Sequence, residues 1–156
     1  MERYPYTLTE KKSRYLLKNK KRDTKSQGVF MDNRQFIEMA KKECKISYSP
    51  YSKIKVGAAL VSENGEIFEG CNIENASYGL SMCAERVVLF KAVSEGQKKF
   101  TKIAVASSSQ AVPPCGACRQ ALSEFSPEME VVWEENGKII SKKLNELLPH
   151  SFGLKK

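Results

Sequence analysis

Histidine is almost absent from this sequence of 156 residues, which contains only His150. A metal site built on several histidines is therefore excluded, and a Ser-His or Cys-His catalytic pair would depend on that one residue. Long apolar runs are also absent: no segment approaches the roughly 20 apolar residues of a membrane helix, and the first residues lack the apolar stretch of a secretion signal. We therefore expect a cytoplasmic protein that has no membrane partner.

Disulfide bonds are not expected either. An odd number of cysteines without a secretion signal argues against a disulfide framework. Clustered cysteines in a reducing compartment more often bind metal or take part in chemistry. The five cysteines are Cys44, Cys71, Cys83, Cys115 and Cys118.

Basic residues are concentrated at the N-terminus. Residues 1–30 hold nine Lys/Arg and three Asp/Glu, whereas residues 31–156 hold seventeen and fifteen. Because the larger part is nearly neutral, nucleic acid is not the expected partner. Residues 1–31 lack an apolar period and are predicted to be a basic, disordered extension of a folded domain over 32–156. We favour a solvated tail or an upstream addition, with Met31 as an alternative start; a localisation signal or an arm for an anionic partner are the alternatives.

The apolar pattern predicts both helices and strands. Asp32 with Gln35 resembles a capping box, which indicates a helix that begins at residue 33. Asn64-Gly65 and Asn136-Gly137 lie between apolar runs and predict two hairpins. The expected helices span 33–46, 83–95, 116–125 and a short 144–148, and the expected strands span 54–62, 66–73, 102–107, 129–133 and 138–142.

The order of these elements predicts an α/β fold. Helices placed before, between and after the strands favour a five-stranded mixed sheet with helices on both faces, a three-layer α-β-α sandwich. Within the helix over 83–95, Val87-Val88-Leu89-Phe90 is apolar on nearly all sides. We therefore expect this helix to be buried in part by another subunit, and the protein to be an obligate oligomer.

A Cys-x2-Cys pair, Cys115 and Cys118, stands at the expected start of the helix over 116–125. Two thiolates at this spacing can bind one Zn²⁺, and the partial positive charge of a helix N-terminus favours both. A redox dithiol or two unrelated cysteines are the alternatives for this pair alone.

Cys83 stands at another expected helix start and supplies a third thiolate. Three protein ligands leave the fourth position open, which is the pattern of a catalytic zinc. A structural zinc would need a fourth ligand, for which Cys44 or Cys71 are the candidates. We rank this second because neither belongs to a ligand-spaced pair, and because Cys44 lies on the apolar face of its helix.

Glu85 follows Cys83 by two residues, where a general acid/base is wanted. Positions i and i+2 do not share a helix face, so both can reach one metal only if the helix tip points at it. Three thiolates and Zn²⁺ sum to −1, and this charge weakens the acidification of a bound water. Arg86 and Arg119 are expected to donate hydrogen bonds to the sulfurs and offset it.

These residues resemble those of the small, homotetrameric, zinc-dependent cytidine deaminases. The signature of zinc deaminases is His- or Cys-x-Glu followed by Pro-Cys-x-x-Cys, here Cys83-Ala84-Glu85 and Pro114 to Cys118. The resemblance covers about 33–154. It also rests on Ser49-Pro50-Tyr51-Ser52, Val56 to Leu60, Gly70 to Tyr78, Cys118-Arg119-Gln120 and Leu147-Leu148-Pro149.

The resemblance implies a catalytic domain that holds one Zn²⁺ per subunit. Glu85 would take a proton from the attacking water, protonate N3 of the base and help protonate the departing ammonia. The backbone of Ala84 would contact the base. Asn72 and Glu74 would hydrogen-bond the ribose 3′-hydroxyl, and the Glu74 carboxylate would repel a 3′-phosphate. The implied zinc ligands are Cys83, Cys115 and Cys118.

Two further positions bear on substrate contact: Ile54, two residues after the Ser-Pro-Tyr-Ser motif, and Phe152, near the C-terminus. The family usually has Phe, packed near the substrate, where this chain has Ile54. The loss of aromatic geometry there is worth about 0.5–1.5 kcal/mol in an aromatic pair. Phe152 matches a family Phe that covers the site, sometimes that of a neighbouring subunit.

The expected function is therefore hydrolytic deamination of free cytidine and deoxycytidine to uridine and deoxyuridine, a step of pyrimidine salvage. A deaminase acting on RNA or DNA, supported only by the basic extension, is one alternative. Deamination of a nucleoside antibiotic such as blasticidin S is another, against which Asn72-Ile73-Glu74-Asn75 argues. A non-enzymatic zinc-binding module, in which Glu85 is dispensable, is the least favoured.

Overall fold

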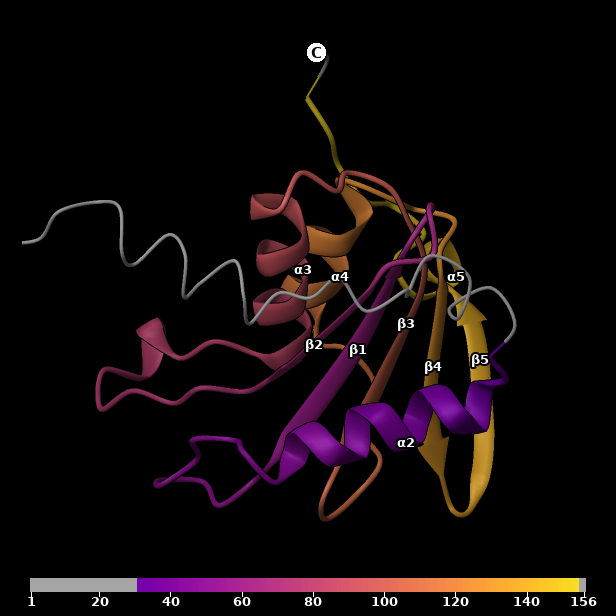
Figure 1. Ribbon diagram of the computed structural model, residues 1–156. Helices are drawn as coiled ribbons and strands as arrows, with labels where there is room; N and C mark the ends of the chain where they lie inside the picture. The colour runs from indigo at the N-terminus through magenta and orange to yellow at the C-terminus, as the bar shows by residue number, and fades with distance from the viewer. Residues whose placement is uncertain (1–30, 155–156) are drawn as a thin grey trace, which may run out of the picture.

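Five strands form one mixed sheet in the computed structural model of the protein, which describes residues 31–154 (Figure 1). The strand order is β2-β1-β3-β4-β5. β3 and β4 are parallel, and the other neighbours are antiparallel. The strands are β1 (Val56–Ser62), β2 (Ile67–Cys71), β3 (Phe100–Ser107), β4 (Glu130–Glu135) and β5 (Lys138–Lys143). The predicted disorder of the N-terminal extension concerns residues 1–30, which lie outside the described range.

Helices cover both faces of the sheet. α2 (Asn33–Cys44) lies across one face (Figure 1), where its Phe36 and Ile37 pack in one buried cluster with Ala59 and Ala104. The opposite face is covered by α3 (Ala84–Ser94), α4 (Gly116–Ser123) and the short α5 (Leu144–Leu147). The predicted three-layer α-β-α sandwich is therefore confirmed.

Local signals position the first layer. The Asp32 carboxylate accepts a hydrogen bond from the Gln35 amide at 2.8 Å, and the Asp32 amide donates to the Gln35 side chain at 3.1 Å, so the predicted capping box is present. Gly57 on β1 lets α2 approach closely, since a Cβ at this position would lie 1.9 Å from the carbonyl oxygen of Ala40. Any side chain here would push α2 away from the sheet.

Both predicted hairpins are confirmed. Asn136 and Gly137 have φ of 51° and 75°, as the tight turn between β4 and β5 requires, and Gly65 has φ of 82° between β1 and β2. The first strand begins at Val56 rather than residue 54. The Val56 amide donates to the side chain of Asn72 and so opens the ladder. A short 3₁₀ turn, η1 (Tyr78–Leu80), was not predicted. No helix within residues 31–154 is long and apolar enough to cross a membrane.

Candidate active site

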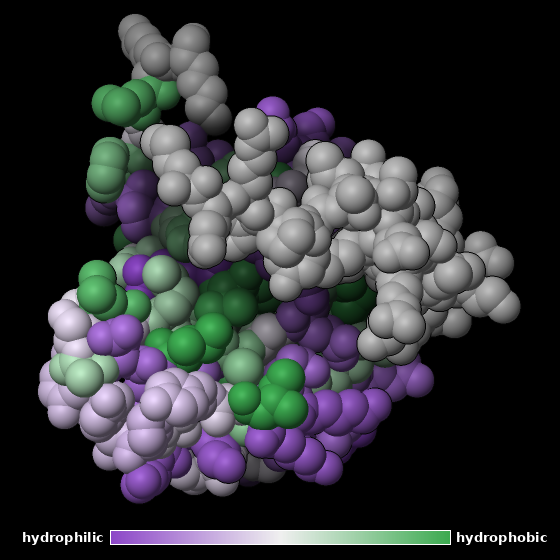
Figure 2. Space-filling model, turned by 60° about the vertical axis from the view of Figure 1, so that its left-hand side comes forward, coloured by the Kyte–Doolittle hydropathy of each residue, from purple (hydrophilic) through white to green (hydrophobic). Residues whose placement is uncertain are grey.

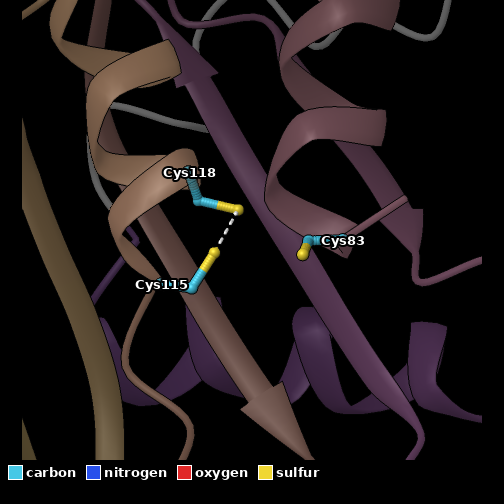
Figure 3. A group of neighbouring side chains, drawn as sticks. All are labelled: Cys83, Cys115 and Cys118. Carbon is cyan, nitrogen blue, oxygen red and sulfur yellow. Dashed lines mark hydrogen bonds between the residues drawn. The ribbon is translucent and has the colours of Figure 1, made fainter. Parts of the chain in front are cut away.

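Three cysteine thiols meet between the first turns of α3 and α4 (Figure 3). Cys83 is the N-cap of α3, Cys115 is the N-cap of α4, and Cys118 lies in the first turn of α4. Their Sγ atoms all lie within 4.8 Å of one another, and Cys115 and Cys118 are 3.5 Å apart. Cys44 and Cys71 do not belong to this group, so neither stands in place as a fourth ligand.

The spacing of these sulfurs fits a zinc ion. Thiolates bind Zn²⁺ at about 2.3 Å, which places two of them about 3.8 Å apart in tetrahedral geometry. The thiols also share hydrogen bonds. The thiol of Cys118 donates to Cys83, and with the Arg86 guanidinium it lowers the pKa of Cys83 to about 5, against the opposing effect of burial. The same shared proton raises the pKa of Cys118, as does burial. The cluster thus holds thiolate character before any metal is considered.

Glu85 lies in the first turn of α3, beside the thiols, and is only 3% exposed. Burial is the main cause that raises the pKa of its carboxyl, and the charge of Cys83 adds to it. Because Cys83 leaves from the tip of α3, both residues line the same cavity. The tip of α3 therefore carries one of the three clustered thiols, with Glu85 in the turn that follows.

The two arginines near the thiols have different partners. Arg86 Nη2 donates to Cys83 Sγ at 3.7 Å. Arg119 was expected to reach a sulfur as well, but its Nε donates to the carbonyl of Pro114 at 2.7 Å and its Nη1 to the carbonyl of Leu147 at 2.8 Å. The guanidinium therefore bonds to backbone carbonyls and not to a sulfur. Arg119 therefore fixes the chain before Cys115 and the end of α5.

The cavity beside the thiols has a volume of about 490 Å³. Of the residues predicted for the site, it is lined by Asn72, Glu74, Cys83, Ala84, Glu85 and Cys115. Tyr51, Ser52 and Tyr78 also line it, with the Tyr51 and Tyr78 rings 6.0 Å apart in an edge-to-face contact. No role was predicted for these three, although the Ser-Pro-Tyr-Ser segment and Tyr78 stand among the motifs of the resemblance.

Asn72 and Glu74, in the segment that follows β2, bind the loop that joins α2 to β1. Asn72 Oδ1 accepts hydrogen bonds from Ser47 and Val56, and its Nδ2 donates to the carbonyl of Ile54 at 2.9 Å. The Glu74 carboxylate accepts from the amides of Tyr51 and Ser52, at 2.9 and 3.3 Å, and from the Ser52 hydroxyl. The Ser52 hydroxyl is the main cause that lowers the pKa of Glu74.

Ile54 and Phe152 do not line the cavity within this chain. Ile54 is 39% exposed and bonds to the residues of the cavity through its backbone, its carbonyl to Asn72 and its amide to the hydroxyl of Ser52. Phe152 is 73% exposed, and only its carbonyl is held, by Gln120 at 2.9 Å. The C-terminal segment leads away from the sheet (Figure 1), so within one chain neither apolar side chain reaches the position that the resemblance implied.

Comparison with known proteins agrees with this geometry. Residues 31–135 match the family described as the cytidine and deoxycytidylate deaminase zinc-binding region. A cytidine deaminase of Halalkalibacterium halodurans is 47% identical over 125 residues, which cover 78% of this chain and 95% of that protein. The crystal structure of a cytidine deaminase from Burkholderia pseudomallei matches with a TM-score of 0.74 at 45% identity, over 78% of this chain and 100% of that one. A blasticidin-S deaminase of Bacillus cereus is 32% identical over 134 residues, 80% of this chain and 95% of that protein.

The fold and the cysteine-capped helix pair thus define a zinc-binding deaminase domain. Within that class, the chain belongs to the cytidine and deoxycytidylate deaminase family.

Proposed function

We propose that this protein is a zinc-dependent cytidine deaminase, which hydrolyses free cytidine and deoxycytidine to uridine and deoxyuridine and releases ammonia. One observation carries the proposal: three thiols meet beside one buried carboxylate, and the carboxylate and two of the thiols line a cavity large enough for a nucleoside. The similarity to proteins named cytidine deaminase, at 45–47% identity, supports the choice of substrate.

The residues that would hold one Zn²⁺ per subunit are Cys83, Cys115 and Cys118. Bound there, zinc supplies an activated water that adds to C4 of the cytosine ring. No fourth side chain joins the group among residues 31–154, so these three ligands would leave one coordination position open to water. Arg86, bonded to Cys83, reduces the negative charge that three thiolates place on the site.

Glu85 would move the protons of the reaction. Its carboxylate takes a proton from the attacking water and delivers it to N3 of the base, and a second transfer protonates the departing 4-amino nitrogen. Burial raises the pKa of Glu85, which makes the carboxyl a better proton acceptor than an exposed glutamate. The adjacent Ala84 lines the cavity at the first turn of α3, where backbone amides are free to contact the base.

Asn72 and Glu74 would bind the ribose 3′-hydroxyl. A carboxylate has about four acceptor positions, and three donors occupy three of those on Glu74. Asn72 Nδ2 makes one hydrogen bond and keeps its second hydrogen. A free hydroxyl can donate to the first and accept from the second. A 3′-phosphate could not donate, and the anionic Glu74 would repel it, which favours a nucleoside over a nucleotide within a strand.

The alternatives have weaker support. A nucleic-acid substrate rests on the basic residues 1–30 alone, while residues 31–156 are nearly neutral. The blasticidin-S deaminase is less similar to this chain than the cytidine deaminase, 32% against 47% identical. A zinc-binding module without activity leaves the buried Glu85 unexplained, because burying an ionisable group that has no role is costly.

We further propose a homotetramer that works in pyrimidine salvage in the cytoplasm, where the thiols of the metal site stay reduced. Large apolar side chains on the surface support self-association. They include Ile46, Tyr48, Ile73, Leu80 and Phe90, each at least 47% exposed. The face that comes forward from the left of Figure 1 carries several hydrophobic patches among hydrophilic residues (Figure 2). Such patches mark interfaces more often than free surface.

The decisive experiment is ammonia release from cytidine, deoxycytidine, CMP, adenosine and single-stranded DNA, with the full chain loaded with zinc. We expect turnover of the two cytosine nucleosides and none of the other three. Ammonia from single-stranded DNA would favour the nucleic-acid alternative. Blasticidin S in a parallel assay tests the antibiotic alternative, which gains if it is the better substrate.

A further inference from the structure

The hydroxyl of Ser52 lies at the centre of a short hydrogen-bond chain on the cavity wall. Its oxygen accepts from the amide of Ile54 at 3.0 Å. Its single hydrogen is therefore directed to the other neighbour, Oε1 of Glu74, which accepts it. The direction of both bonds follows from the partners, since an amide can only donate and an ionised carboxylate can only accept.

This bond determines what Glu74 can still accept. Two backbone amides, of Tyr51 and Ser52, occupy Oε2, while the Ser52 hydroxyl is the only protein donor to Oε1 within residues 31–154. Oε1 therefore keeps one acceptor position with a fixed orientation. Without the hydroxyl, both acceptor positions on Oε1 would be open. Only the two amide hydrogen bonds to Oε2 would then fix the orientation of the carboxylate.

We propose that Ser52 is a positioning residue for sugar recognition: by holding Oε1 of Glu74, it selects nucleosides that carry a free 3′-hydroxyl. The inference rests on the proposed function and on the proposed contact of Glu74 with the ribose. It adds the residue that makes this contact directional. A pre-oriented acceptor binds its donor better than a mobile one, because less freedom is lost on binding.

The loop does not depend on Ser52 to fold. The Glu74 amide donates to the Tyr48 carbonyl at 2.8 Å, and the Tyr48 amide donates to the Asn72 carbonyl at 3.2 Å. These backbone bonds remain in S52A. The side chain of Ser52 is exposed, so its removal leaves no buried group unpaired.

The test compares cytidine with its analogue that lacks the 3′-hydroxyl, in the zinc-loaded full chain of the wild type, S52A and S52T. For S52A we expect the KM for cytidine to rise roughly three- to tenfold, the worth of one hydrogen bond. We expect kcat for cytidine, and the KM for the analogue, to stay near wild type. S52T, which restores a hydroxyl, should recover most of the affinity for cytidine. Ser77→Ala is the matched control, since Ser77 is exposed and lies outside the cavity lining.

Two results would overturn the proposal. An unchanged KM for cytidine in S52A means that the hydroxyl does not matter. An equal rise for both nucleosides means that the loop has loosened as a whole, for example through its turn at Lys53, which has φ of 62°. Wild-type turnover of cytidine separates these outcomes from failure of the proposed function. If the wild type does not deaminate cytidine, both proposals fall together.

Discussion

Arg86 donates a hydrogen bond to the sulfur of Cys83, with 3.7 Å between Nη2 and Sγ. The Nε atom of Arg86 is buried and has no hydrogen-bond partner among residues 31–154. The hydrogen bond from Nη2 to the Cys83 sulfur therefore helps to hold the guanidinium in this position. The hydrogen bond to Cys83 is the main cause that raises the pKa of Arg86, and the charge of the cysteine cluster adds to it.

Arg86→Gln should lower kcat by about 10–100-fold, the usual effect of losing a residue that supports metal ligands. The physical reason is that three thiolates without a nearby cation weaken the acidification of the attacking water. Steady-state kinetics and zinc content by elemental analysis measure the two effects separately. Arg86→Lys keeps the charge and should fall between the wild type and R86Q. A wild-type kcat in fully zinc-loaded R86Q would rule out this role.

Glu85→Gln should abolish turnover while the protein stays folded and zinc-loaded. A general acid/base contributes about 10²–10⁴-fold to a rate, and glutamine can neither accept nor deliver the proton. Because Glu85 is 3% exposed and burial raises its pKa, removing its charge should leave the melting temperature equal or higher. The control is Glu95→Gln at the other end of α3, which should behave as wild type. Activity in E85Q would remove the proposed mechanism.

The metal site should depend on three cysteines and not on the other two. We expect C115S and C118S to lose the bound zinc, and C44A to keep one zinc per chain, because the Cys44 thiol donates instead to the carbonyls of Ala40 and Ala106. Zinc at about a hundred times its Kd adds about 2.7 kcal/mol to the free energy of unfolding. A chelator should therefore lower the melting temperature of the wild type. Zinc loss in C44A would revive a structural four-cysteine site.

The helix starts that carry the site could be predicted from the sequence, because caps and hairpin turns are local signals. Cys83 and Cys115 both prove to be N-caps, and Asn136-Gly137 forms the expected turn. The spacing of a ligand pair is likewise set within one helical turn. The order of strands in the sheet brings α3 beside α4. The order of helices and strands along the sequence had also predicted a mixed sheet with helices on both faces.

Contacts between loops could not be predicted in the same way. Arg119 was expected at a sulfur, but its acceptors are the carbonyls of Pro114 and Leu147, whose positions depend on how two loops fold. The Ser52 hydroxyl bond to Glu74 joins residues 22 positions apart and has no periodic signal. Ile54 and Phe152 illustrate a different limit, since their side chains do not line the cavity of one chain, and the contacts of a single chain do not test a role in a neighbouring subunit.

Acid should weaken a polar network that joins the start of α2 to the sheet. Glu130 accepts hydrogen bonds from Asn33 and Ser141 and pairs with Lys102 at 3.1 Å. Burial acts to raise the pKa of Glu130, but these partners together lower it. A carboxyl whose pKa is lower in the folded state stabilises above its unfolded value, 4.5, and this stabilisation is lost as the pH falls through the folded value.

We therefore expect Glu130→Gln to reduce the free energy of unfolding at pH 7 by about 0.5–1.5 kcal/mol, the net worth of a hydrogen bond. Denaturant titrations of the wild type and E130Q should show that their difference in free energy of unfolding shrinks below pH 4.5. Zinc is removed from both proteins, so that loss of the metal at low pH does not contribute. The exposed pair of Lys99 with Glu63, at 3.8 Å, offers a control. Glu63→Gln should change little. A difference for E130Q that stays constant with pH would contradict the assignment.

Phe90 provides the test of self-association. It lies on α3 next to the buried Val88 and Leu89, yet it is itself 47% exposed. Complete burial of a phenylalanine stabilises by about 1.5–3 kcal/mol, a gain that one chain does not obtain and an interface can supply. We expect light scattering of the wild type to give a multiple of the 17.6 kDa chain mass, and Phe90→Glu to lower it. Lys91→Glu, on the exposed neighbour, controls for the added charge. A wild-type mass of a single chain would contradict both the interface and the homotetramer, because Phe90 would then stay exposed to solvent in the native protein.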